Sequence, residues 1–310
     1  EMVNYFDYAY PAPGPEDQSP FRPTIEVFEP PWNPDTQLVH IGLQGELPAL
    51  EDRPPLNLVF LIDTSGSMND PAKLPLLIQS FRLMLDRLEP QDQVAIVTYA
   101  GSAGVALEPT NAADRASIER ALNLLQAGGS TNGVGGLDAA YELAHEMTEA
   151  GEVSRVLLAT DGDFNVGLSE PAALTDYIAA QREAGTYLSV LGFGRGNLRD
   201  DMMQALAQNG NGTAAYIDTL HEAQRVLVGE LAGARFPIAD DVKLQVEFNP
   251  ARIAEYRLIG YETRALERQD FNNDAVDAGE LGAGHSVTAI YEVTPCGSPA
   301  ILTAPLRYAA

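Results

Sequence analysis

The chain has 310 residues, and its 44 acidic and 19 basic side chains give it a formal net charge of −25 at pH 7. That charge repels nucleic acid and anionic membrane surfaces, so neither is an expected partner. The apolar content of 45% is enough for a packed core, and the one cysteine, Cys296, excludes an internal disulfide bond. No apolar run is long enough to span a bilayer, so no direct membrane span is expected.

The first 55 residues are predicted to contribute an arm and two strands. Residues 1–23, rich in proline, tyrosine and acids, are interpreted as an extended arm whose aromatic side chains hold it against the body of the protein. In residues 24–55, Ile25–Phe28 and Leu38–Leu43 are predicted strands, followed by a proline-rich linker. The chain opens at Glu1 with no leading methionine and no visible signal peptide, from which we expect a processed or trimmed fragment.

Residues 56–233 are predicted to form an α/β domain. The continuous apolar run Leu58–Ile62 is typical of a strand buried on both faces, and strand and helix patterns then alternate. This alternation indicates a doubly wound, mostly parallel sheet. Since only Gly101–Gly104 separate the second strand from the third, the connection is too short for a parallel crossover, and the third strand is expected to be an antiparallel edge. The expected strands are 58–62, 94–99, 105–107, 153–159, 186–193 and 214–217, and the expected helices are 74–88, 113–125, 134–150, 171–184, 198–208 and 220–231.

Helical patterns stop in the last part of the chain, residues 234–310. Four segments with strand character are separated there by loops rich in glycine, asparagine and aspartate: Val242–Phe248, Ala254–Tyr261, Ser286–Val293 and Ile301–Tyr308. Together with the two N-terminal strands they predict one β-sandwich built from both ends of the chain. The α/β domain is then an insertion in that β-domain.

Five oxygen-bearing side chains are predicted to meet at the carboxyl edge of the α/β sheet. In the strand order 3-2-1-4-5-6, the first and fourth strands are neighbours, so Asp63 and Asp161, which end them, face one crevice. Ser65 and Ser67 follow the first strand, and Thr131 lies in the glycine-rich loop that opens the helix before the fourth. Carboxylates and hydroxyls suit a hard divalent cation, Mg²⁺ first and Ca²⁺ or Mn²⁺ as alternatives. Zinc is disfavoured because the four histidines are scattered and the one cysteine is remote.

Other interpretations of these residues stay open at this point. Ser65 and Ser67 could serve only as helix-capping and turn residues, the commonest role of serine there, and Asp163 could brace its loop. A metal-dependent hydrolase, with a metal-bound water as nucleophile, lacks an evident general base, because no histidine follows a strand of the crevice. A phosphate loop is disfavoured because no Gly-Lys-Ser/Thr follows Gly128–Gly133. A metal-free structural scaffold is a further alternative.

The order of these motifs resembles that of a known family. Asp63-Thr64-Ser65-Gly66-Ser67 is similar to the D-x-S-x-S motif of von Willebrand factor type A domains, and Thr131 and Asp161 resemble the threonine and aspartate that complete it. The resemblance covers residues 57–231 and implies a metal-ion-dependent adhesion site, whose cation accepts an acidic side chain from a ligand protein. We therefore expect a cation-dependent protein-binding module for adhesion or assembly, not an enzyme, whose partner offers an Asp or Glu carboxylate.

Four stretches carry a second resemblance, which covers nearly the whole chain: Asn4–Tyr8, Pro31–Pro34, Asp161–Gly167 and Val246–Pro250. They are similar to stretches of the bacterial YfbK-type group of exported, often lipid-anchored proteins. The resemblance implies a location in the cell envelope, periplasmic or at the surface, with a lipid anchor in the full-length protein. Because residues 1–6 resemble an internal stretch of those proteins, the leader and the anchor cysteine are expected to precede this chain.

Overall fold

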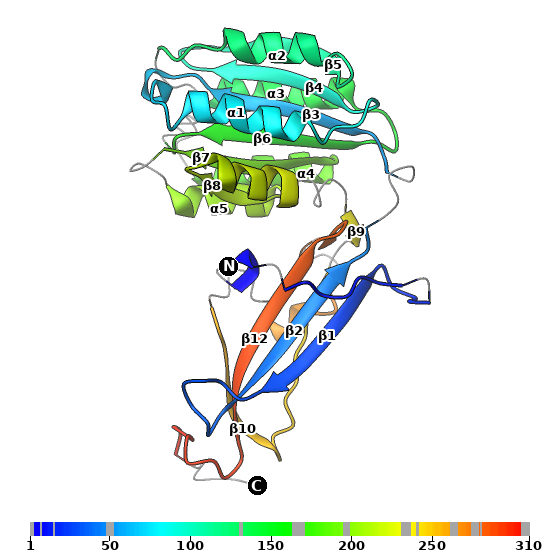
Figure 1. The fold of residues 1–310 in the computed structure, drawn as a ribbon, viewed down its shortest axis with the longest axis vertical. Coiled ribbons are helices and arrows are strands. Elements are labelled where there is room, and N and C mark those ends of the chain that lie inside the picture. The colour runs from blue at the N-terminus through cyan, green and yellow to red at the C-terminus, as the bar shows by residue number, and fades with distance from the viewer. Residues whose placement is uncertain are drawn as a thin grey trace. The chain divides into compact units, whose positions relative to one another are not determined.

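A computed structural model of the chain describes residues 3–6, 8–14, 16–47, 53–129, 133–162, 171–194, 199–230, 237–239, 242–260, 266–273, 279 and 281–304. The chain divides into two compact units. One unit is Ala49–Phe236, and the other combines Glu1–Pro48 with Pro237–Ala310. Each unit has its own main sheet, as Figure 1 shows. The two ends of the chain therefore belong to one unit, and the α/β segment lies between them in the sequence.

The unit Ala49–Phe236 contains a six-stranded sheet with the strand order β5-β4-β3-β6-β7-β8. Its strands are β3 (Leu56–Asp63), β4 (Gln93–Tyr99), β5 (Ala103–Asn111), β6 (Val153–Thr160), β7 (Thr186–Phe193) and β8 (Ala214–Ile217). β5 pairs antiparallel with β4, whereas the other neighbouring strands pair in parallel. Counted from the first strand of the unit, this is the predicted order 3-2-1-4-5-6 with one antiparallel edge, so the prediction of the fold is confirmed.

The helices that connect these strands lie close to the predicted positions. They are α1 (Leu74–Leu85), α2 (Arg115–Leu124), α3 (Gly133–Met147), α4 (Pro171–Glu183) and α5 (Asp200–Asn209), and a short 3-10 turn, η3 (Gly66–Met68), precedes α1. The closing helix begins as α6 (Leu220–Ala223) and continues as the π-helix η4 (Gln224–Glu230). The hydrophobic spacing predicts a helix there but carries no information about the switch to i→i+5 hydrogen bonds.

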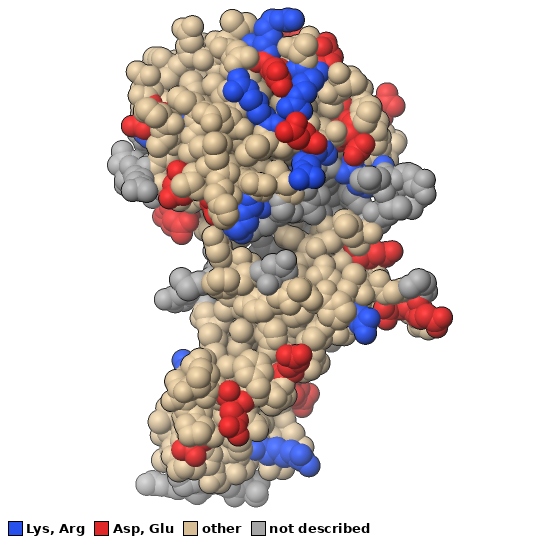
Figure 2. Space-filling model, in the orientation of Figure 1, with Lys and Arg blue, Asp and Glu red and all other residues tan. Residues whose placement is uncertain are grey.

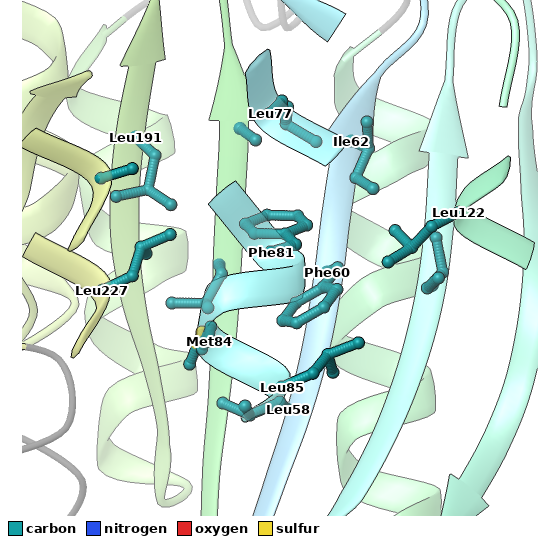
Figure 3. Close-up of a cluster of buried hydrophobic side chains, with 14 of the residues drawn as sticks. Leu58, Phe60, Ile62, Leu77, Phe81, Met84, Leu85, Leu122, Leu191 and Leu227 are labelled. Atoms are coloured by element: carbon teal, nitrogen blue, oxygen red, sulfur yellow. The ribbon is translucent and has the colours of Figure 1, made fainter. Parts of the chain in front are cut away.

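β3 is buried along its whole length because helices cover both faces of the sheet. The side chains of Leu58, Phe60 and Ile62 pack on one face with α1, α2 and the closing helix, whereas the residues between them pack on the other face with α3, α4 and α5. Phe60 stacks on Phe81 of α1 with the ring centroids 4.1 Å apart, a contact visible in Figure 3. The first charged side chain of β3 is therefore Asp63, at its carboxyl end.

The other unit is built on a four-stranded antiparallel sheet with the order β1-β2-β12-β10. Its strands are β1 (Phe21–Phe28) and β2 (Gln37–Gly45) from the N-terminal segment, and β10 (Ile253–Leu258) and β12 (Ser286–Pro295) from the C-terminal one. β9 (Pro237–Ala239) and β11 (Leu281–Gly282) form a two-stranded ribbon. Because β12 pairs with β2, the two ends of the chain share one sheet, as the sequence predicted.

In this unit one predicted strand is wrong, and the described half of another is not a strand. Residues 242–249 alternate in hydrophobicity but form no regular secondary structure. Phe248 instead packs its ring on Tyr256 and Tyr291, with centroids 4.9 and 5.6 Å away. In the predicted strand 301–308, residues 301–304 are not a strand, and the remainder lies outside the described residues. Alternation produces a strand only where a neighbouring strand pairs with its backbone N–H and C=O groups, and the sequence pattern does not show that neighbour.

The N-terminal arm lies against the four-stranded sheet of its own unit. It begins with the short 3-10 helix η1 (Val3–Tyr5). The Tyr10 hydroxyl lies within hydrogen-bond distance of His40 Nε2 at 2.9 Å and of Thr288 Oγ1 at 2.7 Å. The ring of Tyr10 covers Gly42 so closely that a Cβ on Gly42 would lie 2.3 Å from it. An aromatic side chain therefore holds the arm to the sheet, as predicted.

Charged groups of both signs are mixed on the surface. On the face in Figure 2, lysine and arginine side chains lie among acidic ones over the unit with the six-stranded sheet. Arg115, for example, pairs with Asp86 at 2.6 Å and with Glu119 at 2.7 Å. Within the part of the chain that the structure describes, no helix has the length and apolar character needed to cross a membrane.

Candidate metal centre

The carboxyl edge of the six-stranded sheet brings two acidic side chains together. β3 and β6 are parallel neighbours, with Ile62 opposite Ala159. Asp63 is the last residue of β3, and Asp161 directly follows β6. Both are buried, with exposed fractions of 0% and 5%, and the charge of Asp161 contributes to the raised pKa of Asp63. The adjacency of the two acids, predicted from the strand order, is therefore present in the structure.

The hydrogen bonds to the Asp63 carboxylate come from neutral groups. Its Oδ1 accepts the N–H of Ser65 at 2.8 Å, and its Oδ2 lies 3.5 Å from the hydroxyl of Thr160, a long and weak contact. Burial raises the pKa of Asp63, and these hydrogen bonds oppose that effect only in part. Among the described residues, no lysine, arginine or histidine forms an ion pair with Asp63. A buried carboxylate without a countercharge is costly, so the site favours an added cation.

Two hydroxyls lie beside this carboxylate on the turn after β3. The Oγ atoms of Ser65 and Ser67 are 2.9 Å apart, and either can donate to the other. Ser65 is buried, whereas Ser67, in η3, is exposed. Ser65 precedes η3 but makes no side-chain capping bond there, so its hydroxyl is not used as a helix cap in this structure. The capping interpretation of Ser65 is therefore wrong.

The glycine-rich loop is docked on the same turn through its backbone. Gly66 donates its N–H to the carbonyl of Gly129 at 3.1 Å, and Gly128 donates to the carbonyl of Thr64 at 2.8 Å. Gly129 has a φ of +86°, which favours glycine at this position. Thr131, two residues further on, lies outside the described residues. Its place beside the other four oxygen donors therefore stays a prediction.

Asp161 carries an ion pair that the sequence analysis missed. Lys73 Nζ lies 2.8 Å from Asp161 Oδ2 and also donates to the carbonyl of Ser67 at 3.0 Å. A signal for Lys73 was available, because the chain contains just two lysines and one of them directly precedes a helix. A positive charge at a helix N-terminus is unfavourable to the helix dipole, so its presence there calls for another role.

Tyr99, the last residue of β4, also belongs to this region and was missed. Its side chain is fully buried, and burial, followed by the charge of Asp63, raises the pKa of the Tyr99 phenol well above its usual value. The Tyr99 carbonyl accepts the N–H and, at 3.3 Å, the hydroxyl of Thr64. Tyr99 therefore stays a neutral phenol beside the two acids. An aromatic residue at the end of a strand is typical of the hydrophobic core, so the sequence pattern does not indicate that Tyr99 lies beside the two acids.

The described donors suit a hard divalent cation. Two buried carboxylates and two neighbouring hydroxyls are all oxygen donors, the kind that Mg²⁺, Mn²⁺ and Ca²⁺ prefer. Within the described ranges, no group of three or more His, Cys, Asp or Glu side chains is gathered in a metal-binding arrangement. A site with two acids therefore needs hydroxyls, water or an outside carboxylate to complete the coordination of an ion. Asp163 lies outside the described residues, so its bracing role stays a prediction.

Three family models match this chain. The model described as "von Willebrand factor type A domain" matches residues 57–228, which include the six-stranded sheet and the residues of the candidate centre. The model "Uncharacterized protein YfbK, C-terminal" matches residues 233–310, and the model "von Willebrand factor" matches residues 1–40. The segments outside the α/β unit are therefore also related to known sequences.

Individual relatives agree with these matches. The uncharacterized protein YfbK of Escherichia coli (strain K12) is 44% identical over 317 residues, and the match covers 100% of this chain and 54% of that protein. The uncharacterized protein sll0103 of Synechocystis is 29% identical over 174 residues, or 55% of this chain and 40% of that protein. This chain thus spans about half the length of these relatives. A solved von Willebrand factor type A structure from Catenulispora acidiphila has a similar fold, with a TM-score of 0.56, 17% identity and coverage of 90% of this chain and 66% of that chain.

Proposed function

This chain belongs to the von Willebrand factor type A domain family, and we propose that it is a divalent-cation-dependent protein-binding module. The family consists of adhesion and protein-binding modules, often with a metal-ion-dependent adhesion site, and its members are generally not catalysts. In this proposal one ion, Mg²⁺ or alternatively Ca²⁺ or Mn²⁺, is held by five side chains: Asp63, Ser65, Ser67, Thr131 and Asp161. When bound, the ion supplies an electrophile that accepts a carboxylate from a partner protein.

The observation that carries the proposal is the state of Asp63. Its carboxylate is fully buried, it is bound only by neutral groups within the described residues, and it lies next to a second acid. Placing two buried acids together is unfavourable unless a positive charge offsets them. A divalent cation offsets both, and the hydroxyls of Ser65 and Ser67 add oxygen ligands without adding charge.

The same charge balance favours a carboxylate on the partner. The two acids of the site only neutralise the formal charge of a divalent ion, and water or an outside oxygen must complete its coordination. The chain as a whole is strongly acidic, so a partner that offers Asp or Glu would otherwise be repelled. A bound cation reverses the sign of the potential locally and gives such a partner one attractive point. The desolvated contact between ion and carboxylate would anchor the interface.

The location of this binding is part of the proposal. We propose a place in the cell envelope, periplasmic or at the surface, and this proposal rests on the resemblance of four stretches of the sequence to exported proteins. The partner is then a protein of the envelope or of the medium. Nucleic acid is not proposed as a partner, because the net charge is −25.

A capture experiment tests the proposal. The protein is immobilised and exposed to a cell-envelope extract of its native organism in Mg²⁺ and in EDTA. We expect a captured protein that is released by EDTA, returns with Mg²⁺ or Mn²⁺, and is not retained by Asp161→Ala. Asp176→Ala, which removes an exposed acid on α4, is the matched control and should leave capture unchanged.

Circular dichroism shows whether Asp161→Ala keeps its fold, which separates loss of the site from loss of the protein. Capture of a native partner that ignores both EDTA and Asp161→Ala would show that the cation does not mediate binding. The crevice would then be a structural feature, as in the scaffold alternative.

A further inference from the structure

The ammonium group of Lys73 lies inside the cluster proposed to bind the cation. Its Nζ contacts Asp161 Oδ2 at 2.8 Å and the Ser67 carbonyl at 3.0 Å, so it bridges the residues that follow β3 and β6. The chain has two lysines among its 310 residues, and the other, Lys243, belongs to the other unit. Lysine is therefore rare in this chain, and one of its two lysines lies at the proposed cation site.

The path of the Lys73 side chain is shaped by its surroundings. Its aliphatic carbons pass directly over Gly194, which follows β7 and has a φ of +86°. A Cβ on Gly194 would lie 2.5 Å from Lys73 Cε, so only glycine leaves room for this path. Tyr216 of β8 donates its hydroxyl to the carbonyl of Gly194 and holds that backbone in place. The absence of a side chain at Gly194 therefore leaves room for the Lys73 side chain to reach Asp161.

Lys73 is not locked into the protein. Its side chain is 20% exposed, whereas that of Asp161 is 4% exposed. The ammonium can therefore move into solvent by rotation of its flexible side chain, without unfolding of the sheet edge. A lysine is a compact point charge on a flexible stem, which suits a reversible contact better than the rigid fork of an arginine does.

A lysine and a divalent ion cannot both lie close to the Asp161 carboxylate without repelling each other. The site carries two acids, and Lys73 offsets one of the two negative charges when no other cation is present. A divalent ion that takes Asp161 as a ligand would lie next to the ammonium in a buried region, where like charges repel strongly. Binding of the ion is thus coupled to departure of Lys73.

We propose that Lys73 is a tethered competitor for the cation site: its ammonium occupies Asp161 in the metal-free protein and must leave when a divalent ion binds. The inference rests on the proposed function, because it assumes that Asp161 is a ligand of the ion. The consequence is that a higher concentration of divalent cation is needed to fill the site than would be needed without Lys73. The site fills only when the concentration of divalent cation is high enough to displace Lys73, and filling frees the Ser67 carbonyl in η3 from its lysine donor.

A titration with Mn²⁺ tests the competition. The chelator-treated protein, Lys73→Met and the control Lys243→Met are titrated at the same ionic strength. Met keeps most of the stem and removes the charge, and the control removes the same charge from a lysine whose Nζ binds the Asn273 carbonyl instead. We expect Lys73→Met to bind Mn²⁺ about ten-fold more tightly than the unchanged protein, within the range typical of coupled ligands, and Lys243→Met to bind as the unchanged protein does.

The outcomes separate this inference from the proposed function. Equal or weaker binding by Lys73→Met, while the unchanged protein binds, overturns the competition and leaves the cation site intact. Binding by Lys73→Met alone supports the competition in its strongest form. If neither protein binds Mn²⁺, the cation site itself is wrong, and the inference fails with it.

A second measurement covers the case in which Lys73→Met folds poorly. Protein labelled with ¹³C at the ε position of lysine should give two lysine signals, because the chain has two lysines. The variant Lys243→Arg assigns the signal of Lys73. We expect Mg²⁺ to shift the Lys73 signal towards that of a solvent-exposed lysine and to leave the Lys243 signal in place. A Lys73 signal that stays unchanged when Mg²⁺ is bound would overturn the proposal.

Discussion

The Oγ atoms of Ser65 and Ser67 lie 2.9 Å apart, so the two hydroxyls of the turn after β3 bond to each other. The backbone N–H of Ser65 points at the same time to Asp63 Oδ1, at 2.8 Å. One short turn thus gathers a buried carboxylate and two neutral oxygen donors. Such preorganisation lowers the cost of ordering ligands around a cation.

The first prediction distinguishes a serine that binds the cation from a serine that stabilises the fold. Ser67→Ala should weaken Mn²⁺ binding by about ten-fold, a change of about 1.4 kcal/mol, because one oxygen donor is lost. The same change should leave the free energy of unfolding in EDTA nearly unchanged, since the Ser67 side chain is exposed. Isothermal titration and chemical denaturation measure the two quantities.

Ser80→Ala is the reciprocal control for this pair of measurements. Ser80 is buried in α1 and donates to the Leu76 carbonyl at 2.7 Å, so its loss should lower stability by about 1 kcal/mol and leave Mn²⁺ affinity unchanged. Full cation affinity in Ser67→Ala would remove this serine from the site.

The second prediction concerns the charge of Asp63 without a cation. Burial, together with the charge of Asp161, raises the pKa of Asp63 above its ordinary value of 3.8. A raised pKa in the folded state means that ionisation costs stability as the pH rises through that folded pKa. In EDTA at pH 7, Asp63→Asn should therefore be more stable than the unchanged protein, by on the order of 1 kcal/mol. Below pH 3.8, where the carboxyl is protonated in both states, the difference should disappear.

In Mg²⁺ the order of stability should reverse, so that Asp63→Asn is less stable than the unchanged protein. A ligand at 100 times its dissociation constant stabilises the folded state by about 2.7 kcal/mol, and Asp63→Asn should gain much less because it lacks a carboxylate ligand. Thermal unfolding in EDTA and in Mg²⁺ measures both signs. A variant that is less stable than the unchanged protein in EDTA at pH 7 would contradict the picture of an uncompensated buried acid.

The third prediction concerns the pH dependence of the four-stranded sheet. Burial raises the pKa of Glu292, but hydrogen bonds from Arg257, Thr36 and Trp32 together outweigh it, so the pKa lies below its ordinary value of 4.5. A lowered pKa contributes stability above the unfolded-state pKa, and that stability is lost as the pH falls through the folded-state pKa. Glu292→Gln should lower the free energy of unfolding by about 1 kcal/mol at pH 7. The loss is small because Arg257 is largely exposed and solvent screens its charge.

Denaturation from pH 7 down to pH 3 checks the prediction for Glu292. The cost of Glu292→Gln should shrink as the pH falls, and Glu247→Gln, at an exposed acid of the same unit, should cost little at any pH. A cost that is independent of pH would mean that the shape of the Glu292 side chain matters and its charge does not.

The fourth prediction concerns the core that supports the site. Phe60 and Phe81 are both fully buried and stacked, and Phe60 lies on the same strand as Asp63. Phe81→Ala should destabilise the unit with the six-stranded sheet by about 3–5 kcal/mol, because it leaves a cavity between α1 and β3. Leu124→Ala, at an exposed position of α2, should change stability by less than about 0.5 kcal/mol. A small loss in Phe81→Ala would show that α1 can close the gap.

The strand order and the place of the two acids could be predicted because each depends on local patterns. A run such as Leu58–Ile62 has no polar face, which predicts a strand between two layers of helices, and a polar residue directly after it marks the carboxyl edge. The short connection at Gly101–Gly104 was sufficient to predict the antiparallel edge. Once the order is known, the adjacency of Asp63 and Asp161 follows without further information.

Other features depend on partners that a pattern does not contain. The alternation at Val242–Phe248 was mistaken for a strand because the sequence cannot show whether a neighbouring strand is available. The contact of Lys73 with Asp161 joins residues 88 positions apart and depends on the path over Gly194. The burial of the Tyr99 phenol beside the acids depends in the same way on tertiary packing.

The proposed cation site is best tested by counting the divalent ions that the chelator-treated protein binds, using electron paramagnetic resonance of free Mn²⁺ at a fixed ionic strength. We expect one saturable Mn²⁺ site, for which Mg²⁺ competes, that is lost in Asp63→Ala and kept in Asp176→Ala, the exposed control on α4. Saturable binding that persists unchanged in Asp63→Ala, or an absence of saturable binding in both the unchanged protein and Lys73→Met, would contradict this expectation.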